Sequence, residues 1–173
     1  DQIDSHHIIA PDDDARSTSV MEAMRSYRAS EVAMRRRTQQ SMDMGENELL
    51  VLRFLARARL RADIAPGHAE RIKQLTREGF YNNVPFHRVI AGFMAQTGDG
   101  MRGDGTGGSN YPDLKAEFSN VSFQRGVVGM ARKGQPNTAN SQFFIVYGDA
   151  SFLDGQYTVI GEVVSGMEVV DSL

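Results

Sequence analysis

The sequence predicts an α+β fold, in which an N-terminal helical extension precedes a β-rich barrel or sandwich. Residues 17–58 have the composition and apolar spacing of helices. After Gly79 the chain consists of short apolar runs separated by Gly, Pro, Asn and Asp, which is typical of a small β-rich domain. A length of 173 residues favours one domain with an appendage. We therefore expect a helical extension over residues 1–58 and a β-rich domain over residues 59–173.

The composition excludes several classes of function. There is no cysteine, which excludes thiolate catalysis and cysteine-ligated zinc or iron–sulfur centres. The formal net charge is −3, so no overall field attracts the chain to nucleic acid or to an anionic membrane. No apolar run approaches the roughly 18–20 residues of a membrane span, and the first residues lack the layout of a signal peptide. We expect a cytoplasmic protein with no metal, no cofactor and no membrane anchor.

The helical extension divides into a tail and two helices. Residues 1–12 are polar and predict a disordered tail. A first helix is expected over residues 17–44, where the basic run Arg35-Arg36-Arg37 is interpreted as a solvated helix face rather than a contact to nucleic-acid phosphates. A second helix begins near Glu46. It is apolar almost all the way round over residues 49–55, as in a buried helix or one that packs against a partner.

Residues 24–58 weakly resemble the opening helices of MarR-type winged-helix regulators. The likeness lies in a long helix with an arginine run, followed by Met44-Gly45-Glu46-Asn47-Glu48-Leu49-Leu50-Val51-Leu52-Arg53-Phe54-Leu55. The recognition helix and β-wing with which such regulators bind DNA have no counterpart further along the chain. The resemblance therefore does not extend to DNA binding, and nucleic acid is not an expected partner.

One helix and a series of strands are expected in the β-rich domain. The helix begins at Pro66, which suits a first turn, and ends at Gly79, where a left-handed cap belongs. Its His68 is expected to be a partly exposed polar residue. Residues 57–62 fit either a strand or the frayed end of the preceding helix, and a short helix begins at Gly166. The other expected strands are residues 86–90, 94–97, 127–132, 142–147 and 157–164.

A glycine-rich loop over residues 98–109 contains Gly103-Asp104-Gly105-Thr106-Gly107-Gly108, which matches the dinucleotide-binding pattern G-x-G-x-x-G. That pattern requires a helix directly after the loop, and Ser109-Asn110-Tyr111-Pro112 does not readily begin one. The loop is instead expected to be a flexible flank of a pocket. His87, upstream of it, is interpreted as a hydrogen-bonded structural histidine.

Three apolar, strand-like stretches each carry a polar side chain that a core would not need. By strand alternation, Arg88, Gln96 and Gln142 would line one concave surface together with large apolar side chains. No general base or nucleophile accompanies them, so the pocket suits a reaction that breaks no covalent bond. Rotation about an X-Pro peptide bond is such a reaction, with a barrier of about 18–20 kcal/mol that arises from amide resonance. A guanidinium lowers this barrier by donating a hydrogen bond to the proline nitrogen, whose lone pair is available only in the twisted amide.

Residues from about 64 to 171 resemble a cyclophilin, the cyclosporin-binding class of peptidyl-prolyl cis-trans isomerases. The blocks that carry the resemblance are Phe80-Tyr81, Phe86-His87-Arg88-Val89-Ile90, Gly92-Phe93-Met94-Ala95-Gln96-Thr97-Gly98-Asp99, Gly105-Thr106-Gly107-Gly108, Gly129-Met130-Ala131, Asn140-Ser141-Gln142-Phe143-Phe144-Ile145 and Leu153-Asp154-Gly155. The resemblance implies a cyclophilin-like antiparallel β-barrel. It also implies isomerisation of X-Pro bonds in peptides and unfolded proteins, without a covalent intermediate or a cofactor.

The same resemblance implies roles for individual residues. Arg88 corresponds to the catalytic arginine. Phe152 stands where many members have tryptophan, which implies weaker binding of cyclosporin-type ligands. Tyr157 occupies a position often held by histidine, and Arg132 one often held by asparagine. The residues expected to bind substrate are Phe93, Met94, Gln96, Ala131, Arg132, Gln142, Phe144, Phe152, Leu153 and Tyr157.

The two ends of the chain depart from the cyclophilin pattern. Members of that family have one or two strands before the first helix and a further strand after the position of Asp171, and these strands close the barrel. Here a helical segment precedes the domain and the terminal strands are missing or replaced, which leaves a sheet edge open to self-association. The leading hypothesis is a prolyl isomerase. The second is a proline-peptide binding module with little or no catalysis because the barrel is incomplete, and the third is a DNA-binding regulator built on residues 17–58.

Overall fold

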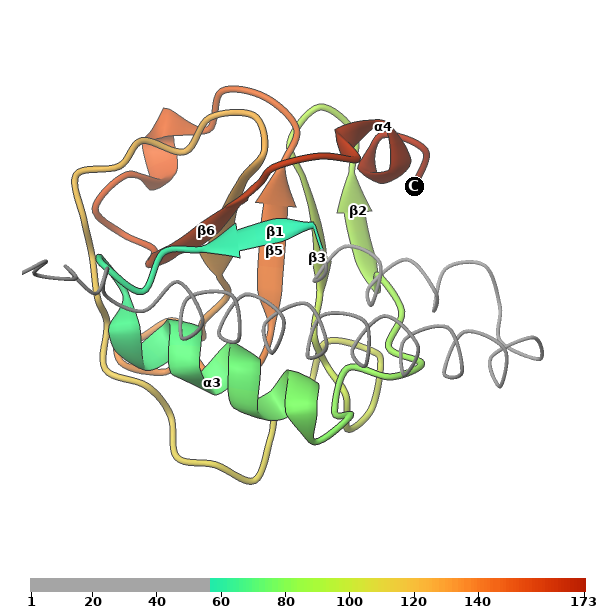
Figure 1. Ribbon diagram of the computed structural model, residues 1–173, viewed down its shortest axis with the longest axis vertical. Helices are drawn as coiled ribbons and strands as arrows, with labels where there is room; N and C mark the ends of the chain where they lie inside the picture. Colours follow the sequence, from blue (N-terminus) through green and yellow to red (C-terminus); the bar gives the residue numbers. More distant parts are fainter. Residues whose placement is uncertain (1–56) are drawn as a thin grey trace, which may run out of the picture. The chain divides into compact units, whose positions relative to one another are not determined.

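The computed structural model describes residues 57–173 (Figure 1). Residues 1–56 lie outside the described part of the chain. The predicted tail, the two predicted N-terminal helices and all but the last two residues of the segment that resembles regulators fall in this range. Between Arg57 and Leu173, no helix is long and apolar enough to cross a membrane.

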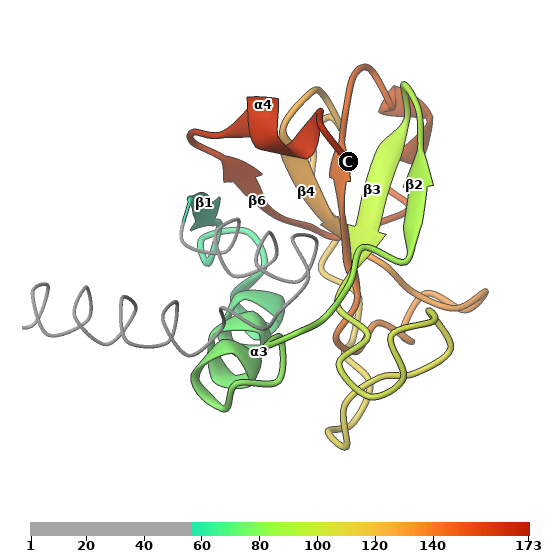
Figure 2. The ribbon, with the colours of Figure 1, turned by 90° about the vertical axis from the view of Figure 1, so that its right-hand side faces the viewer.

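Six strands form one antiparallel sheet in the order β1-β6-β4-β5-β3-β2 (Figure 1). The strands are β1 Ala58–Leu60, β2 Arg88–Ile90, β3 Met94–Thr97, β4 Val127–Met130, β5 Phe143–Val146 and β6 Val159–Val163. Within the described part of the chain the sheet does not close, so β1 and β2 are its two edges and lie on opposite sides in Figure 2. The antiparallel, β-rich domain is therefore confirmed, with an open sheet in place of a closed barrel.

Some predicted strands are longer than the observed ones. The strand predicted over residues 86–90 begins only at Arg88, because its ladder with β3 stops there. Arg88 is opposite Gln96, and two residues later Gly98 turns the chain away with a φ of +94°. The segment 57–62, for which strand and helix were both open, contains β1.

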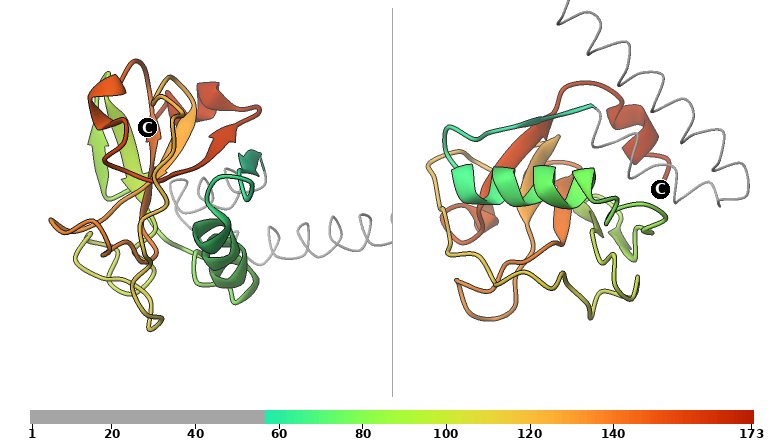
Figure 3. Two further views of the ribbon diagram at one scale, coloured as in Figure 1. Left: turned by 90° about the vertical axis from the view of Figure 1, so that its left-hand side faces the viewer. Right: turned by 60° about the horizontal axis from the view of Figure 1, so that its bottom comes forward.

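The helix α3, Pro66–Arg77, covers one face of the sheet (Figure 3). Ile72 and Leu75, which are spaced to share one side of the helix, are buried in the cluster that joins it to the strands. The helix ends as predicted at a left-handed Gly79 with a φ of +75°, and the N–H of Phe80 donates to the Leu75 carbonyl at 2.9 Å.

The first turn of α3 is capped by a distant carboxylate. Glu117 accepts hydrogen bonds from the backbone N–H groups of Gly67 and His68, each at 3.0 Å, and its Oε2 lies 2.6 Å from Nδ1 of His68. The prediction that His68 is partly exposed is wrong, because its side chain is fully buried. It lies one helical turn before Ile72, on the stripe that faces the sheet.

Two short helices complete the secondary structure of the described residues. The 3₁₀ helix η1 is Ser151–Leu153, and α4 is Met167–Val170. The short helix predicted near Gly166 is confirmed. Arg125 holds the end of α4, because its guanidinium donates to both carboxylate oxygens of Asp171, at 2.9 and 2.7 Å.

Alternate residues of the central strands point to opposite faces of the sheet. Ala95 and Ile145 are opposite each other and are buried with the residues of α3. Gln96 and Phe144, the next pair along, therefore face the other side. That second face has its own apolar cluster, whose buried members are Met94, Phe123, Phe144, Val146, Ala150 and Val159.

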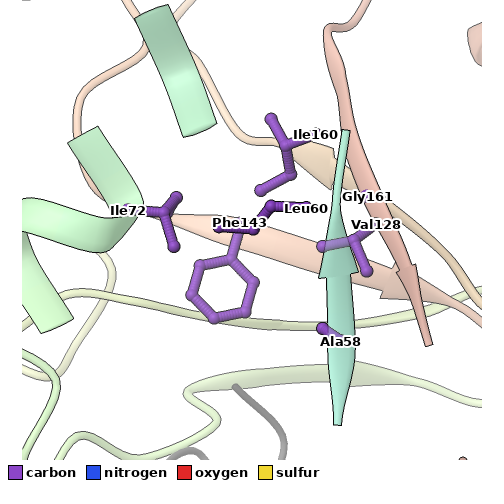
Figure 4. A pocket seen from close by; sticks show the side chains of 7 residues that line it. All are labelled: Ala58, Leu60, Ile72, Val128, Phe143, Ile160 and Gly161. Atoms are coloured by element: carbon purple, nitrogen blue, oxygen red, sulfur yellow. The ribbon is translucent and has the colours of Figure 1, made fainter. Parts of the chain in front are cut away.

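A small hollow lies on the α3 face, between that helix, β1 and the sheet. It is lined by Ala58, Leu60, Ile72, Val128, Phe143, Ile160 and Gly161 (Figure 4). Its volume is about 10 Å³, close to the lower limit for one water molecule. None of these lining residues carries a polar side-chain atom that could bind a ligand or a water. We interpret the hollow as a gap in the packing, away from the polar residues on the opposite face.

Candidate active site

A chain of side-chain hydrogen bonds connects the three polar residues that the sequence analysis singled out. Arg88 and Gln96 are opposite each other on β2 and β3, and Nη1 of Arg88 donates to Oε1 of Gln96 at 3.4 Å. Nε2 of Gln96 donates to Oε1 of Gln142 at 2.9 Å. Nε2 of Gln142 in turn donates to the carbonyls of Gly105 and Gly107, at 2.9 and 2.7 Å. The arginine is exposed, whereas both amides are partly buried.

An apolar floor lies beside this chain on the same face of the sheet. Met94 and Phe144 are buried there, and the ring of Phe123 stacks on that of Phe144 with 5.6 Å between centroids. Gly129 is opposite Phe144 on β4, and a Cβ at this position would lie only 2.5 Å from Cε1 of Phe123. The two rings can therefore rest against the strand only because residue 129 has no side chain.

Aromatic residues form the walls of the floor. The ring of Tyr157 meets Phe144 edge-on at 5.7 Å, and the guanidinium of Arg132 lies over Tyr157 at 4.5 Å from its centroid. On another side, Phe93 packs against Phe152 at 5.3 Å. Phe152 is 63% exposed, so it presents an aromatic surface at the rim.

The structure brings together every residue that the sequence analysis assigned to the site. Arg88 is linked to the others through Gln96, Phe152 through Phe93, and Arg132 through Tyr157. Four further site residues are partly buried and pack against the apolar cluster on this face: Phe93, Ala131, Leu153 and Tyr157. The residues that strand alternation and the resemblance assigned to the pocket are thus joined in one set of contacts, and the pocket itself stays a prediction.

The glycine-rich loop is held in place, so the prediction of a flexible flank is wrong. Asp99 is only 1% exposed, and its carboxylate accepts hydrogen bonds from backbone N–H groups of the loop. Oδ1 accepts from Met101 and Arg102, at 3.2 and 2.9 Å, and Oδ2 accepts from Gly105 and Gly107, each at 2.9 Å. Burial alone would raise the pKa of Asp99, but these donors outweigh it and lower the pKa to about 2. Sequence reasoning missed this anchor, although an aspartate before a run of glycines is a possible signal for it.

His87 lies behind the same loop. Both ring nitrogens are buried, and neither lies in hydrogen-bond geometry with another group of residues 57–173, although the nearby Gln142 side chain acts to raise the pKa of the ring. Burial fits the predicted structural histidine, whereas its predicted hydrogen bond is not formed. A Cβ at Gly105 would lie 2.8 Å from Cδ2 of His87, which shows how closely the loop packs on the ring. Burial lowers the pKa of His87 and favours its neutral form, with nearby Asp99 acting in the opposite direction.

The chemistry that this site offers is limited and specific. It combines an exposed guanidinium, two amides held by hydrogen bonds, and an apolar floor with aromatic walls. No group of three or more His, Asp or Glu side chains within the described region could hold a metal ion. Such a surface can bind an apolar ring next to a hydrogen-bond donor.

Comparison with known proteins identifies the family. The family described as cyclophilin type peptidyl-prolyl cis-trans isomerase/CLD matches residues 56–173. A probable peptidyl-prolyl cis-trans isomerase of Brucella suis is 61% identical over 124 residues, covering 66% of this chain and 63% of that protein. The human peptidyl-prolyl cis-trans isomerase-like 3 is 44% identical over 112 residues, covering 62% of this chain and 68% of that protein. The chain thus spans less than two thirds of the Brucella relative.

Solved structures agree with the sequence comparison. A cyclophilin-type isomerase of Cryptosporidium parvum, crystallised in the presence of the dipeptide Ala-Pro, matches with a TM-score of 0.63 and 32% identity, covering 67% of this chain and 76% of that one. A cyclophilin from Hirschia baltica matches with a TM-score of 0.61 and 28% identity, covering 67% of this chain and 62% of that one. The fold, the gathered site residues and these matches together show that the chain belongs to the cyclophilin-type peptidyl-prolyl cis-trans isomerase family.

Proposed function

We propose that this chain catalyses cis–trans isomerisation of X-Pro bonds in peptides and unfolded proteins. The observation that carries the proposal is the exposed guanidinium of Arg88, held by Gln96 at the border of the apolar floor formed with Met94 and Phe144. Membership of the cyclophilin family supports it. So does the isomerase of Cryptosporidium parvum, whose structure was determined in the presence of the dipeptide Ala-Pro.

The proposed mechanism follows from what the twisted amide needs. The proline ring lies on Met94 and Phe144, with Leu153 beside it, and this contact fixes one side of the peptide bond. Arg88 donates a hydrogen bond to the proline nitrogen, which is a good acceptor only when rotation has broken the amide resonance. The interaction is stronger in the transition state than in the ground state, and therefore lowers the barrier without a covalent intermediate.

The geometry leaves Arg88 available for this role. A guanidinium has five N–H donors, and its hydrogen bond to Gln96 is long, at 3.4 Å. Gln142 differs from Gln96, because both N–H groups of its Nε2 donate within the protein, whereas Gln96 uses only one of its two. We therefore assign Gln142 to orienting Gln96, and assign the contacts with the peptide backbone to Gln96 and to the main chain at Ala131 and Arg132.

The rim and the sheet edges suggest further partners. Phe152 offers a smaller ring than tryptophan, so we propose that cyclosporin-type ligands bind weakly. The unpaired edges of β1 and β2 are proposed sites of self-association, because each has backbone groups that another strand could pair with. Sedimentation velocity over a hundredfold range of protein concentration tests this second proposal, which predicts a growing dimer fraction.

One observation favours the alternative function, a proline-peptide binding module with little catalysis. Arg88 lies on an edge strand whose three residues are all exposed, and β3 supports that strand from one side only. Catalysis requires the guanidinium within about 0.5 Å of its productive position, whereas binding on the apolar floor tolerates more movement. The two functions therefore differ in the effect on rate, and both predict binding.

Two-dimensional NMR exchange spectroscopy of a short X-Pro peptide separates these functions. The isomerase proposal predicts faster cis–trans exchange with the parent protein and no acceleration with Arg88→Ala. Arg77→Ala is the matched control, because Arg77 is an exposed arginine at the end of α3 and its removal should leave exchange unchanged. Binding of the peptide without faster exchange would support the binding module and overturn the isomerase proposal.

A further inference from the structure

The orientation of a side-chain amide can be transmitted along a row of hydrogen bonds. Each amide has an acceptor at one end and donors at the other, so fixing one end fixes what the other end presents. In this site the two amides of Gln96 and Gln142 are in series, and Arg88 is at one end of the row. At the other end are the carbonyls of Gly105 and Gly107.

The donors and acceptors in this row agree at every step. Two carbonyls at the loop require the NH₂ group of Gln142, which directs its Oε1 to Gln96. That oxygen requires the NH₂ group of Gln96, whose own Oε1 is then directed to Arg88. If Gln142 turned over, Gln96 would present its NH₂ group to the guanidinium, and two donors would face each other.

The loop that carries these carbonyls is anchored by Asp99. Its Oδ2 binds the N–H groups of Gly105 and Gly107, the two residues whose carbonyls receive Gln142. The loop is also confined sterically. A Cβ at Gly107 would lie 3.0 Å from Cγ of Asp99, and one at Gly105 would lie 2.8 Å from the ring of His87. The two glycines are thus packed against a buried carboxylate and the ring of His87, so the loop that carries their carbonyls has little room to shift.

We propose that Asp99 is a positioning residue for Arg88, acting through the loop carbonyls and the amides of Gln142 and Gln96. Asp99 does not touch substrate. It holds the loop so that the amide row presents an oxygen, and not an NH₂ group, to the guanidinium. The proposal rests on the proposed function, since it concerns the same arginine. The low pKa of Asp99, about 2, keeps the carboxylate ionised at any pH used to measure activity.

The test replaces the carboxylate with its neutral isostere. Asp99→Asn keeps the shape but loses one acceptor and the charge, so the loop amides lose part of their anchor. We expect kcat for X-Pro exchange to fall by about tenfold with little change in KM, because displacements well under 1 Å lower rates strongly. Asp63→Asn is the matched control. Asp63 is exposed and its carboxylate accepts from Arg61, away from the glycine-rich loop, so its replacement should leave kcat within about twofold of the parent value.

Two further readouts distinguish positioning from a general loss of structure. In ¹H–¹⁵N spectra, Asp99→Asn should shift the side-chain NH₂ signals of Gln96 and Gln142, and the Nε–H signal of Arg88, with backbone signals of α3 unchanged. In a double-mutant cycle, Asp99→Asn should cost little more once Gln142→Met is present, because both substitutions act on the same row. If Asp99→Asn does not fold, Gln142→Met breaks the same row while keeping the bonds from Asp99 to the loop, and should lower kcat similarly.

The outcomes are distinct. A kcat unchanged in Asp99→Asn, or an equal loss with and without Gln142→Met, would overturn the positioning role while leaving the isomerase function intact. A parent protein without activity would instead remove the proposed function. The NMR spectra would then still test the row of hydrogen bonds. If Asp99→Asn leaves the side-chain signals of Gln96, Gln142 and Arg88 unshifted, the row is refuted independently of catalysis.

Discussion

The substitution Gly129→Ala tests whether the floor of the site depends on the close approach of two rings to β4. A Cβ at residue 129 would lie nearest to Cζ of Phe144, and 2.5 Å from Cε1 of Phe123. Ordinary contact begins at 3.4 Å, so Phe123 must retreat by 3.4 − 2.5, or about 0.9 Å, and Phe144 by slightly more. Phe123 is fully buried and stacked on Phe144, so the movement displaces both rings.

The expected cost follows from this displacement. Forcing one extra methyl group into a packed core typically costs about 1–3 kcal/mol. For a domain of this size we expect Tm to fall by roughly 5–10 °C in thermal unfolding. Because the floor moves by nearly 1 Å, we also expect kcat/KM for X-Pro exchange to fall by up to about 10²-fold.

A control and a rescue make the reasoning refutable. Gly134→Ala adds the same methyl group where no atom lies within 4 Å, so stability should stay within about 0.5 kcal/mol of the parent. Phe123→Leu should restore part of the stability when it is combined with Gly129→Ala, because the smaller side chain makes room. Equal Tm values for the parent and Gly129→Ala would refute the view that the glycine makes the floor possible.

Three further predictions concern the walls, the helix cap and the rim. Arg132→Ala removes the cation over Tyr157; we expect a loss of about 1 kcal/mol and a severalfold rise in KM with kcat nearly constant, and an unchanged KM would contradict the stacking role. Burial lowers the pKa of His68 below its ordinary 6.5, with Glu117 opposing. The unfolded chain therefore binds more protons below pH 6.5, and stability falls as the pH decreases from that value; urea unfolding at pH 5 and 7 should show a smaller difference for His68→Asn. Phe152→Trp should lower the Kd for cyclosporin, as measured by isothermal titration calorimetry. An unchanged Kd would exclude Phe152 as the cause of weak binding.

Much of the fold could be predicted from local signals. Pro66 and Gly79 bracket α3 because proline suits a first helical turn and glycine suits a left-handed cap, and both act within a few residues. The face shared by Arg88, Gln96 and Phe144 follows from the two-residue period of strands. The resemblance to cyclophilins supplied the other site residues, and the structure brings them together on that face.

The errors concern interactions between distant segments. His68 was expected to be partly exposed, but it pairs with Glu117, which lies 49 residues away, and no local pattern contains that information. The glycine-rich loop was expected to be flexible, but it is anchored at Asp99. The four N–H groups that bind this carboxylate converge only when the loop has folded, so the anchor was not predicted from the sequence. Gly129 could have been noticed, since a glycine inside a strand often marks a close approach of other groups.

The most direct test of the central claim, that this face of the sheet binds proline, is a ¹H–¹⁵N titration with two peptides. One contains X-Pro and the other has alanine in place of proline. The account predicts that the X-Pro peptide shifts the backbone signals of Met94, Gln96 and Phe144 together with the side-chain signal of Arg88, and that the alanine peptide shifts them far less. Equal shifts with both peptides, or shifts confined to α3 and the opposite face, would contradict it.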